Sequence, residues 1–197
     1  ICKKEIRMSV VGLDTILELV KLEEKLIEDL GARELENPEG VGVDLRLGAL
    51  FKIVKGGAFI EEDSDTGLGR RKGVKSKEIA VYVHGAKKQN EIIIKPGDYF
   101  LAQTYETINT PMDLMPLVFP RTSLFRAGLL LLNSKTDPGY RGKLTMGLTN
   151  LSPFPVKLQM GARICNIVFF KIEGKTTKYR GQHQGGRVSP EKEERQV

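Results

Sequence analysis

The side chains best suited to chemistry in this sequence gather in two short polar segments. In the first, Arg121, Thr122, Ser123 and Arg126 lie close together between apolar stretches. Guanidinium groups and hydroxyls bind phosphate oxygens well, because they donate hydrogen bonds in defined directions. A solvated turn explains the same residues without any ligand, so the residues alone leave both interpretations open.

The second segment reads Asp-Pro-Gly-Tyr-Arg-Gly over residues 137–142. Its Pro-Gly pair strongly favours a tight turn, which needs no function. The same turn would also bring together three useful groups within a few residues. Asp137 could act as a base, Tyr140 could stack on a ligand, and Arg141 could pair with a phosphate.

Elsewhere the sequence offers isolated candidates. Asp44 lies between apolar residues and could be structural, and Arg163 opens an apolar strand. The histidines, His84 and His183, do not form a metalloprotease pattern, and no glycine-rich phosphate loop with its lysine is present. Cys165 lies in an apolar run, where a buried and inert thiol is expected. These observations disfavour zinc, thiol and P-loop chemistry.

The composition indicates a single intracellular domain. The chain has 197 residues, of which 40% are hydrophobic, and 31 basic against 25 acidic side chains give a net charge of +6. A modest positive charge suits a polyanionic partner such as a nucleotide. The apolar runs are too short to cross a bilayer and no signal peptide is visible, so we expect a cytoplasmic protein without a membrane partner.

The elements that must position the candidate residues are mostly strands. Apolar residues at helical spacing predict one amphipathic helix over Leu13–Leu30, which Gly31 would end. Short apolar runs punctuated by turn residues then predict an all-β sandwich or barrel. Besides an alternating stretch from Val43, the predicted strands are Ile79–Val83, Glu91–Ile94, Tyr99–Thr104, Leu114–Phe119, Leu129–Leu132, Leu144–Thr149, Val156–Leu158 and Ile164–Phe170.

Two segments lack any apolar period. Residues 61–77 change from acidic to basic, and we predict an exposed loop between strands. Residues 174–197 are rich in Gly, Gln and Arg and cannot build a core, so we expect a flexible tail. The chain therefore divides into an N-terminal segment with the helix (1–31), a barrel domain (41–173) and the tail.

Five motifs in register carry a resemblance to a known family. They read VDLRLG, KPGD, RTSLFRAGL, DPGYRG and GARI, at residues 43–48, 95–98, 121–129, 137–142 and 161–164. Together they resemble the dUTPase and dCTP deaminase superfamily. The resemblance implies a distorted β-barrel or jelly-roll of the β-clip type. It also implies a homotrimer with active sites between subunits, a deoxynucleoside triphosphate substrate, and Mg²⁺ bound through the triphosphate.

The resemblance to dUTPases further implies a role for individual residues. Asp137 would orient the attacking water as a general base toward the α-phosphorus, and Tyr140 would stack on the deoxyribose. Asp44 would hold a water on the metal ion, and Arg126, a deaminase-like feature, would join the catalytic residues. The substrate-binding residues would be Arg121, Thr122, Ser123, Asn133, Arg141, Arg163, Tyr179, Gln182 and Arg187.

One position separates the two branches of this superfamily. The deaminases normally carry a glutamate where this chain has Gly147, and glycine cannot shuttle a proton to the pyrimidine ring. We therefore expect hydrolysis of dUTP to dUMP and pyrophosphate. The alternative is dCTP deamination, alone or combined with hydrolysis, which Arg126 and the deaminase-like tail segment 178–185 favour.

Two other function classes remain open. The hairpin between Gly128 and Asp137 is shorter than in either branch, which would permit a nucleotide-binding relative without catalysis. A nucleic-acid-binding barrel would fit the positive charge. However, only 7% of the residues are aromatic and they form no stacking pattern, so no specific nucleic acid is expected. The tail, which carries Arg180 and Arg187, is predicted to close over the triphosphate as a lid.

Overall fold

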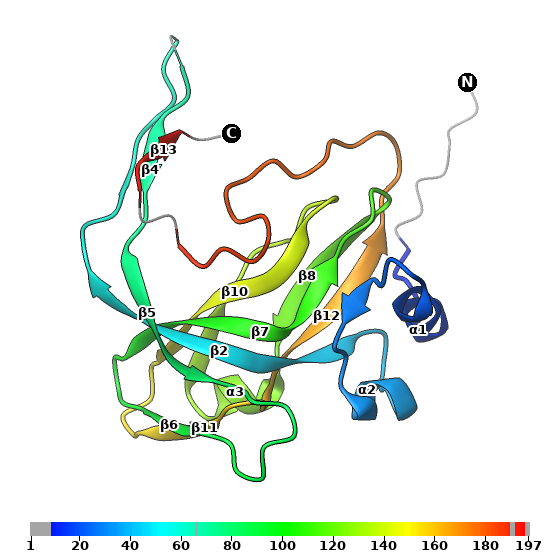
Figure 1. Ribbon diagram of the computed structural model, residues 1–197, viewed down its shortest axis with the longest axis horizontal. Coiled ribbons are helices and arrows are strands. Elements are labelled where there is room, and N and C mark those ends of the chain that lie inside the picture. The colour runs from blue at the N-terminus through cyan, green and yellow to red at the C-terminus, as the bar shows by residue number, and fades with distance from the viewer. Residues whose placement is uncertain (1–8, 66, 190–191, 196–197) are drawn as a thin grey trace.

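An eight-stranded antiparallel sheet forms the centre of the molecule and curls into a nearly closed barrel (Figure 1). The computed structural model describes residues 9–65, 67–189 and 192–195. Along the sheet the strands follow the order β8 (Leu114–Pro120), β12 (Arg163–Lys171), β2 (Val43–Lys55), β7 (Tyr99–Asn109), β10 (Arg141–Asn150) and β9 (Leu129–Leu132). In addition, β5 (Lys75–Val81) pairs with β2, and β1 (Ile27–Glu28) pairs with β7.

Within the described residues, two smaller sheets and three helices complete the fold. Strand β6 (Glu91–Ile94) pairs with β11 (Val156–Gln159), and β4 (Arg70–Lys72) lies between β3 (Phe59–Ile60) and β13 (Glu194–Arg195). The helices are α1 (Leu13–Lys21), α2 (Ala32–Glu36) and α3 (Thr122–Arg126). The predicted all-β barrel with an N-terminal amphipathic helix is confirmed.

The apolar runs form strands because their side chains fill the barrel. Val43, Leu45 and Leu47 alternate along β2 and are fully buried, as are Leu148 on β10 and Ile167 on β12. Burying a side chain of this size stabilises the fold by about 1.5–3 kcal/mol. The strands predicted from residue 91 onward are confirmed, with the largest change at the C-terminal end of β7, which extends to Asn109.

The N-terminal helix is shorter than its sequence pattern predicted. Helix α1 ends at Lys21, and Leu22 is already extended. Ile27, predicted as helical, lies in β1 and pairs with Ile108 at the end of β7. Ile27 and Leu30 match the helical spacing because both are buried, but the backbone of Ile27 pairs with the end of β7 instead of continuing a helix. Gly31 precedes α2 instead of ending the first helix.

The segments predicted as a loop and a flexible tail pair with each other. Residues 61–77 contain β4 and the start of β5, so the prediction of a loop was wrong at residues 70–72 and 75–77, while the described part of residues 62–68 is exposed as expected. Residues 56–65 and 67–75, here called the arm, project from the barrel, and the end of the tail pairs with the arm as β13 (Figure 1). In register, Glu194 pairs with Arg71 and Arg195 with Arg70. Backbone hydrogen bonds of this kind need no apolar period, which is why the hydrophobic pattern did not predict them.

A buried ion pair joins the two central strands of the barrel. The Arg46 side chain on β2 donates from Nε to Glu106 Oε1 on β7 at 2.7 Å, and the Arg46 amide donates to Glu106 Oε2 at 2.8 Å. Glu106 is fully buried. The guanidinium of Arg46 also lies 4.8 Å from the ring centroid of Tyr105. Both oxygens of this carboxylate therefore have partners, as burial of a charge requires.

Replacing Glu106 with alanine is expected to destabilise the barrel by about 3–5 kcal/mol, because Arg46 would keep a largely buried charge without a partner. Urea denaturation followed by circular dichroism would measure the change. Glu78→Ala, at an exposed position on β5, is the matched control and should stay within about 0.5 kcal/mol of the parent. Equal effects of the two variants would contradict a structural role for the pair.

None of the helices in the described part of the chain combines the length and apolar character needed to cross a membrane.

The predicted burial of Cys165 is confirmed. Its side chain is fully enclosed in β12, and burial raises the pKa of the thiol. A buried thiol with a raised pKa is a poor nucleophile, so Cys165 is not a candidate catalytic residue.

Candidate active site

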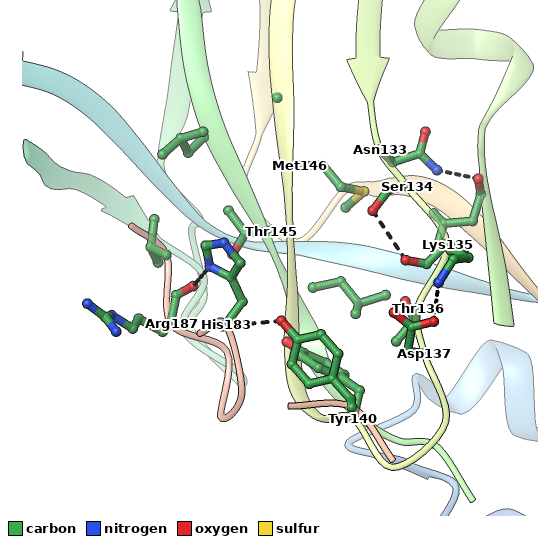
Figure 2. A pocket seen from close by; sticks show the side chains of 16 residues that line it. Asn133, Ser134, Lys135, Thr136, Asp137, Tyr140, Thr145, Met146, His183 and Arg187 are labelled. Atoms are coloured by element: carbon green, nitrogen blue, oxygen red, sulfur yellow. Dashed lines mark hydrogen bonds and ion pairs between the residues drawn. The ribbon is translucent and has the colours of Figure 1, made fainter. Parts of the chain in front are cut away.

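A cavity of about 370 Å³ opens between the turn around Asp137, strand β10 and the C-terminal tail (Figure 2). We call it the hairpin cavity. Its volume lies within the range of about 300–1,000 Å³ that is usual for small-molecule sites. The polar and aromatic side chains that line it are Asn133, Ser134, Lys135, Thr136, Asp137, Tyr140, Thr145, Tyr179, His183 and Arg187.

Asp137 enters the hairpin cavity from the turn that the sequence predicted. Gly139 has a positive φ of 75°, which residues with a side chain rarely adopt, and its amide donates to the Thr110 carbonyl at 2.9 Å. The Asp137 carboxylate forms an ion pair with Lys135 and keeps about 40% of its side-chain surface exposed (Figure 2). A carboxylate that faces a cavity and remains accessible can accept a proton from a bound water.

Tyr140 forms a buried wall of the hairpin cavity. Its hydroxyl donates to the Lys143 carbonyl at 2.6 Å, and its ring meets the ring of Tyr179 edge to face, with centroids 5.4 Å apart. Burial raises the pKa of the Tyr140 phenol to about 12. Tyr140 is therefore a rigid, uncharged surface, which suits the stacking role that the sequence predicted.

An alkaline titration followed by ultraviolet absorption should resolve Tyr140 from the other tyrosines. Its pKa is raised, so the phenol stays neutral through pH 10, the ordinary value, and ionises at about pH 12 in the folded protein. Tyr140→Phe should remove the step at about pH 12. Loss of an early step in Tyr140→Phe would contradict the burial of this phenol.

The tail lies over the turn of its own chain. The Tyr179 amide donates to the Pro138 carbonyl at 2.7 Å, and the Gly185 amide donates to the Arg141 carbonyl at 2.8 Å. Gln103, buried on β7, donates to the Gly186 carbonyl at 2.7 Å. These contacts place Tyr179, His183 and Arg187 of the tail against the hairpin cavity. The function of the tail as a lid stays a prediction.

Only some of the predicted substrate-binding residues lie together at the hairpin cavity. Asn133 lines the hairpin cavity, while its amide group donates to the Val118 carbonyl (Figure 2). Arg141 points away and pairs with Glu24 beyond the end of α1, at 3.0 Å. Gln182 lines a neighbouring cavity, and its buried amide oxygen has no hydrogen-bond partner among the described residues.

Arg121, Thr122, Ser123 and Arg126 line a different cavity from that of Asp137. Their segment forms the short helix α3, with Arg121 as its N-cap residue. The short helix turns back because the amide of Gly128, with a positive φ of 84°, donates to the Phe125 carbonyl at 3.0 Å. Arg126, Thr122 and Ser123 remain exposed on this surface.

A cluster of charged side chains lies at the bottom of this second cavity. Asp44 Oδ2 pairs with Arg121 and, at 3.0 Å, with Arg163, while its Oδ1 accepts from Asn166 at 3.0 Å. The buried Glu34 of α2 accepts from the Asp44 amide at 3.0 Å. Burial and the nearby Arg163 lower the pKa of Arg121. The cluster fixes Arg121 at the cavity, whereas Arg163 pairs with Asp44 and is not among the lining residues.

The described residues do not fit a resident metal ion. They contain no group of three or more His, Cys, Asp and Glu side chains that could hold one. Both oxygens of Asp44 already have arginine or amide partners, and its side chain is 8% exposed. A direct bond from Asp44 to a metal is inconsistent with this arrangement. Its predicted contact through water stays a prediction.

The two cavities have no lining residue in common. The motif around Asp137 therefore faces one hollow, and the motif around Arg121 faces another. A single chain does not bring the predicted base and the predicted phosphate-binding arginine into one site.

Gly147 lies on the wall of the hairpin cavity and leaves it without a carboxylate at that position. A Cβ atom built at this glycine would lie 2.6 Å from Tyr99 Oη, so a side chain could fit only if Tyr99 moved. Asp137 is thus the only carboxylate among the described residues that line the cavity. The Tyr99 side chain thus occupies the space that a glutamate side chain would need at position 147.

Sequence reasoning missed several residues of these two sites. Lys135 could have been found, because it stands two residues before Asp137 in a polar run. His183 lies in the tail motif and now faces the hairpin cavity. Glu34 had no signal in the sequence, because its partners Asp44 and Arg163 are remote and its helix is short.

Comparison with known proteins gives consistent results. Residues 10–172 match a family model described as dCTP deaminase-like. A Sulfurihydrogenibium protein named "dCTP deaminase, dUMP-forming" is 38% identical over 147 residues, which cover 74% of this chain and 76% of that protein. A protein of the same name from Persephonella marina is 34% identical over 174 residues, covering 87% of this chain and 89% of that protein.

The fold is also found among solved structures. The crystal structure of 2′-deoxycytidine 5′-triphosphate deaminase from Agrobacterium tumefaciens superposes with a TM-score of 0.60 at 15% sequence identity. The match covers 83% of this chain but only 48% of that one, so this chain spans about half the length of the Agrobacterium protein. At this level of identity the likeness concerns the fold alone.

Proposed function

We propose that this chain, which belongs to the dCTP deaminase-like family, is an enzyme that forms dUMP from a pyrimidine deoxynucleoside triphosphate. Membership of the dUTPase and dCTP deaminase superfamily, inferred above from five motifs, is confirmed. The names of the relatives from Sulfurihydrogenibium and Persephonella marina support dCTP as the starting nucleotide and dUMP as the product.

The observation that carries this proposal is the position of Asp137 in the hairpin cavity beside Tyr140 and the tail. Its carboxylate would accept a proton from a water as the water oxygen attacks the α-phosphorus. The bond from that phosphorus to the bridging oxygen breaks, and inorganic pyrophosphate leaves. Tyr140 would hold the sugar, and Arg187 would neutralise phosphate charge from the tail.

Mg²⁺ would be carried into the site by the oxygens of the triphosphate, and it would neutralise part of their charge. The chain's own contribution is then to bind the nucleotide and to hold the water. Lys135, paired with Asp137, would keep the carboxylate directed into the cavity. The Tyr140–Tyr179 contact would exclude bulk water from one side.

A second candidate is a hydrolase that accepts dUTP and not dCTP. Gly147 favours it, because the hairpin cavity has no carboxylate other than Asp137 among its described lining residues. Deamination would then require a water to replace the amino group at C4 of the ring, which leaves as ammonia, and another lining group such as His183 to transfer the proton. The two candidates share the phosphoanhydride step and differ only in the chemistry at the base.

Incubation of the purified chain with Mg²⁺ and either dCTP or dUTP tests both candidates, with products separated by ion-exchange chromatography. Formation of dUMP from dCTP would support the family activity and mean that Gly147 is not disabling. Formation of dUMP from dUTP but not from dCTP would favour the hydrolase. Tight nucleotide binding without any product would overturn both and leave a catalytically silent binder.

We further propose that the active enzyme is a homotrimer in which α3 of one subunit completes the hairpin cavity of the next. Support comes from the two separate cavities and from exposed apolar side chains near α3. Phe119 on β8, Phe125 on α3 and Leu132 on β9 are each about half exposed. Apolar surface of this kind on neighbouring elements is typical of an interface between subunits.

Subunit mixing should restore activity from two inactive variants if the sites lie between copies. Asp137→Asn and Arg126→Ala would each be nearly inactive alone. After co-expression, about a quarter of the sites should contain both parental residues, because mixing at a heterologous interface is random. Light scattering would establish the oligomeric state. Co-expressed variants that stay inactive would contradict a site shared between subunits.

A further inference from the structure

The end of the tail is attached to the arm, a segment for which the sequence suggested no function. Strand β13 pairs with β4 of the arm through its backbone, and the Ser189 hydroxyl donates to the Val74 carbonyl at 2.7 Å. Figure 1 shows the end of the tail lying beside the arm, away from the barrel. Both attachments join segments of the same chain, so neither of them needs a second subunit.

Ion pairs reinforce this attachment, and Arg70 on β4 lies at their centre. Its Nη1 pairs with Glu193 of the tail at 2.7 Å, and its Nη2 pairs with Glu61 of the arm at 2.5 Å. A second bond to Glu61 runs from Arg70 Nε at 2.8 Å. A planar guanidinium can hold two carboxylates at once, whereas a lysine is a single point charge. Arg70 therefore ties the tail to both strands of the arm.

The attached end of the tail also contacts Arg187, which lines the hairpin cavity. Glu194 on β13 accepts from Arg187 Nη2 at 2.5 Å, and the Arg187 carbonyl accepts from His183 Nδ1 at 3.1 Å (Figure 2). The pair with Glu194 uses one nitrogen of the guanidinium, so Arg187 keeps further donors for a ligand. A chain of contacts thus runs from the arm through Glu194 and Arg187 to the cavity.

The tail has little apolar contact with the barrel. Among the described residues 174–189 no side chain is fully buried, and only Tyr179 packs against the barrel core. A segment with few buried apolar contacts opens locally at a low free energy, without unfolding of the whole protein. The contacts between the end of the tail and the arm should therefore decide how often the tail lifts from the hairpin cavity.

We propose that the arm clamps the tail of its own subunit over the hairpin cavity, with Arg70 as a positioning residue that acts through β13 on Arg187. Loss of this clamp would let the tail lift more often, and a bound nucleotide would leave faster. The clamp itself is a property of the folded chain. Only its effect on nucleotide release rests on the proposed function, so the two can fail separately.

Hydrogen–deuterium exchange of the full chain without ligand tests the clamp directly. The Tyr179 and Gly185 amides report lifting of the tail, because both are bonded to the turn around Asp137. Arg70→Gln should raise their exchange rates by about three- to tenfold at low salt, since it removes exposed ion pairs that each contribute a small factor. The parent in about 1 M salt should approach the variant, because the Debye length falls to about 3 Å.

Lys157→Gln is the matched control, because it removes an exposed ion pair of 3.3 Å to Glu91 on the small sheet of β6 and β11. It should leave exchange of the tail amides at the parental rates. Arg70→Lys should lie between the parent and Arg70→Gln, since a lysine pairs with one carboxylate at a time. Parental exchange of the tail amides in Arg70→Gln would overturn the clamp. An equal rise in the amides of β7 and β10 would also overturn it, because it would indicate a loss of barrel stability.

The dissociation rate of dUMP, measured by NMR line-shape analysis, gives a readout that a purely structural role would not change. This rate should rise in Arg70→Gln and stay at the parental value in Lys157→Gln. Faster exchange of the tail amides with an unchanged dissociation rate would overturn the positioning role of Arg70. Failure of the parent to bind dUMP would count against the proposed function, and the exchange rates would still decide on the clamp.

Discussion

Replacement of Asp137 by asparagine should lower the rate of dUMP formation by about 10²–10⁴-fold, the usual contribution of a general base. The amide has the size of the carboxylate but cannot take a proton from the attacking water. The turn should keep its shape, because backbone bonds from Gly139 to Thr110 and from Tyr140 to Asp137 hold it. Initial rates at saturating dUTP and dCTP would measure the loss.

The loss of activity in Asp137→Asn should appear in kcat and not in the affinity for the nucleotide. The affinity for dUMP, measured by calorimetry, should change by less than about tenfold, since the proposed partner of Asp137 is the attacking water and not the nucleotide. Asp113→Asn, which neutralises an exposed carboxylate outside the hairpin cavity, is the matched control and should keep the parental rate. Hydrolysis at the parental rate in Asp137→Asn would refute the mechanism proposed for this enzyme.

Removal of the chain from Lys178 onward should lower kcat/KM by about 10²-fold, as loss of a closing segment does when water enters and groups are misplaced. The deletion takes away Tyr179, His183 and Arg187, which line the hairpin cavity. Stability should fall by less than about 2 kcal/mol, because none of the described residues removed is fully buried and only Tyr179 among them packs against the barrel core.

A shorter deletion from Lys192 onward provides the control for the longer one. It removes β13 and its pairing with the arm but no residue of the hairpin cavity. Activity should fall less than in the longer deletion, and the difference would report the contribution of the cavity-lining residues themselves. If the longer deletion retains parental turnover, the tail has no role as a lid.

Much of the barrel could be predicted because its strands carry their own local signals. The runs at residues 91–94 and 129–132 are bounded by turn residues and form strands with those same bounds. The turn at residues 137–142 was readable because proline and glycine restrict the backbone directly. The first helix was overextended because Ile27 and Leu30 keep a helical spacing while lying outside it, Ile27 in a strand paired with β7.

The sequence predicted which residues belong to the candidate site but not how they are arranged, because local signals do not report contacts between distant segments. Motif order was sufficient to indicate the family and to single out Asp137, Tyr140 and Arg121 as a group. It did not show that Arg121 faces a separate cavity, where Asp44 and Arg163 hold it. Nor did it reveal Glu34, whose importance comes from a buried contact with a residue ten positions away on another element.

The sequence by itself determined the strands, the turns and the residue types at the site, because these depend on side-chain period and backbone preference within a few residues. Only the tertiary structure decided which distant segments meet. Pairing of the arm with the tail, burial of Arg46 against Glu106 and the separation of two cavities all depend on hydrogen bonds and charges between segments remote in the chain. Such contacts leave no local pattern, because each partner satisfies the other only after folding.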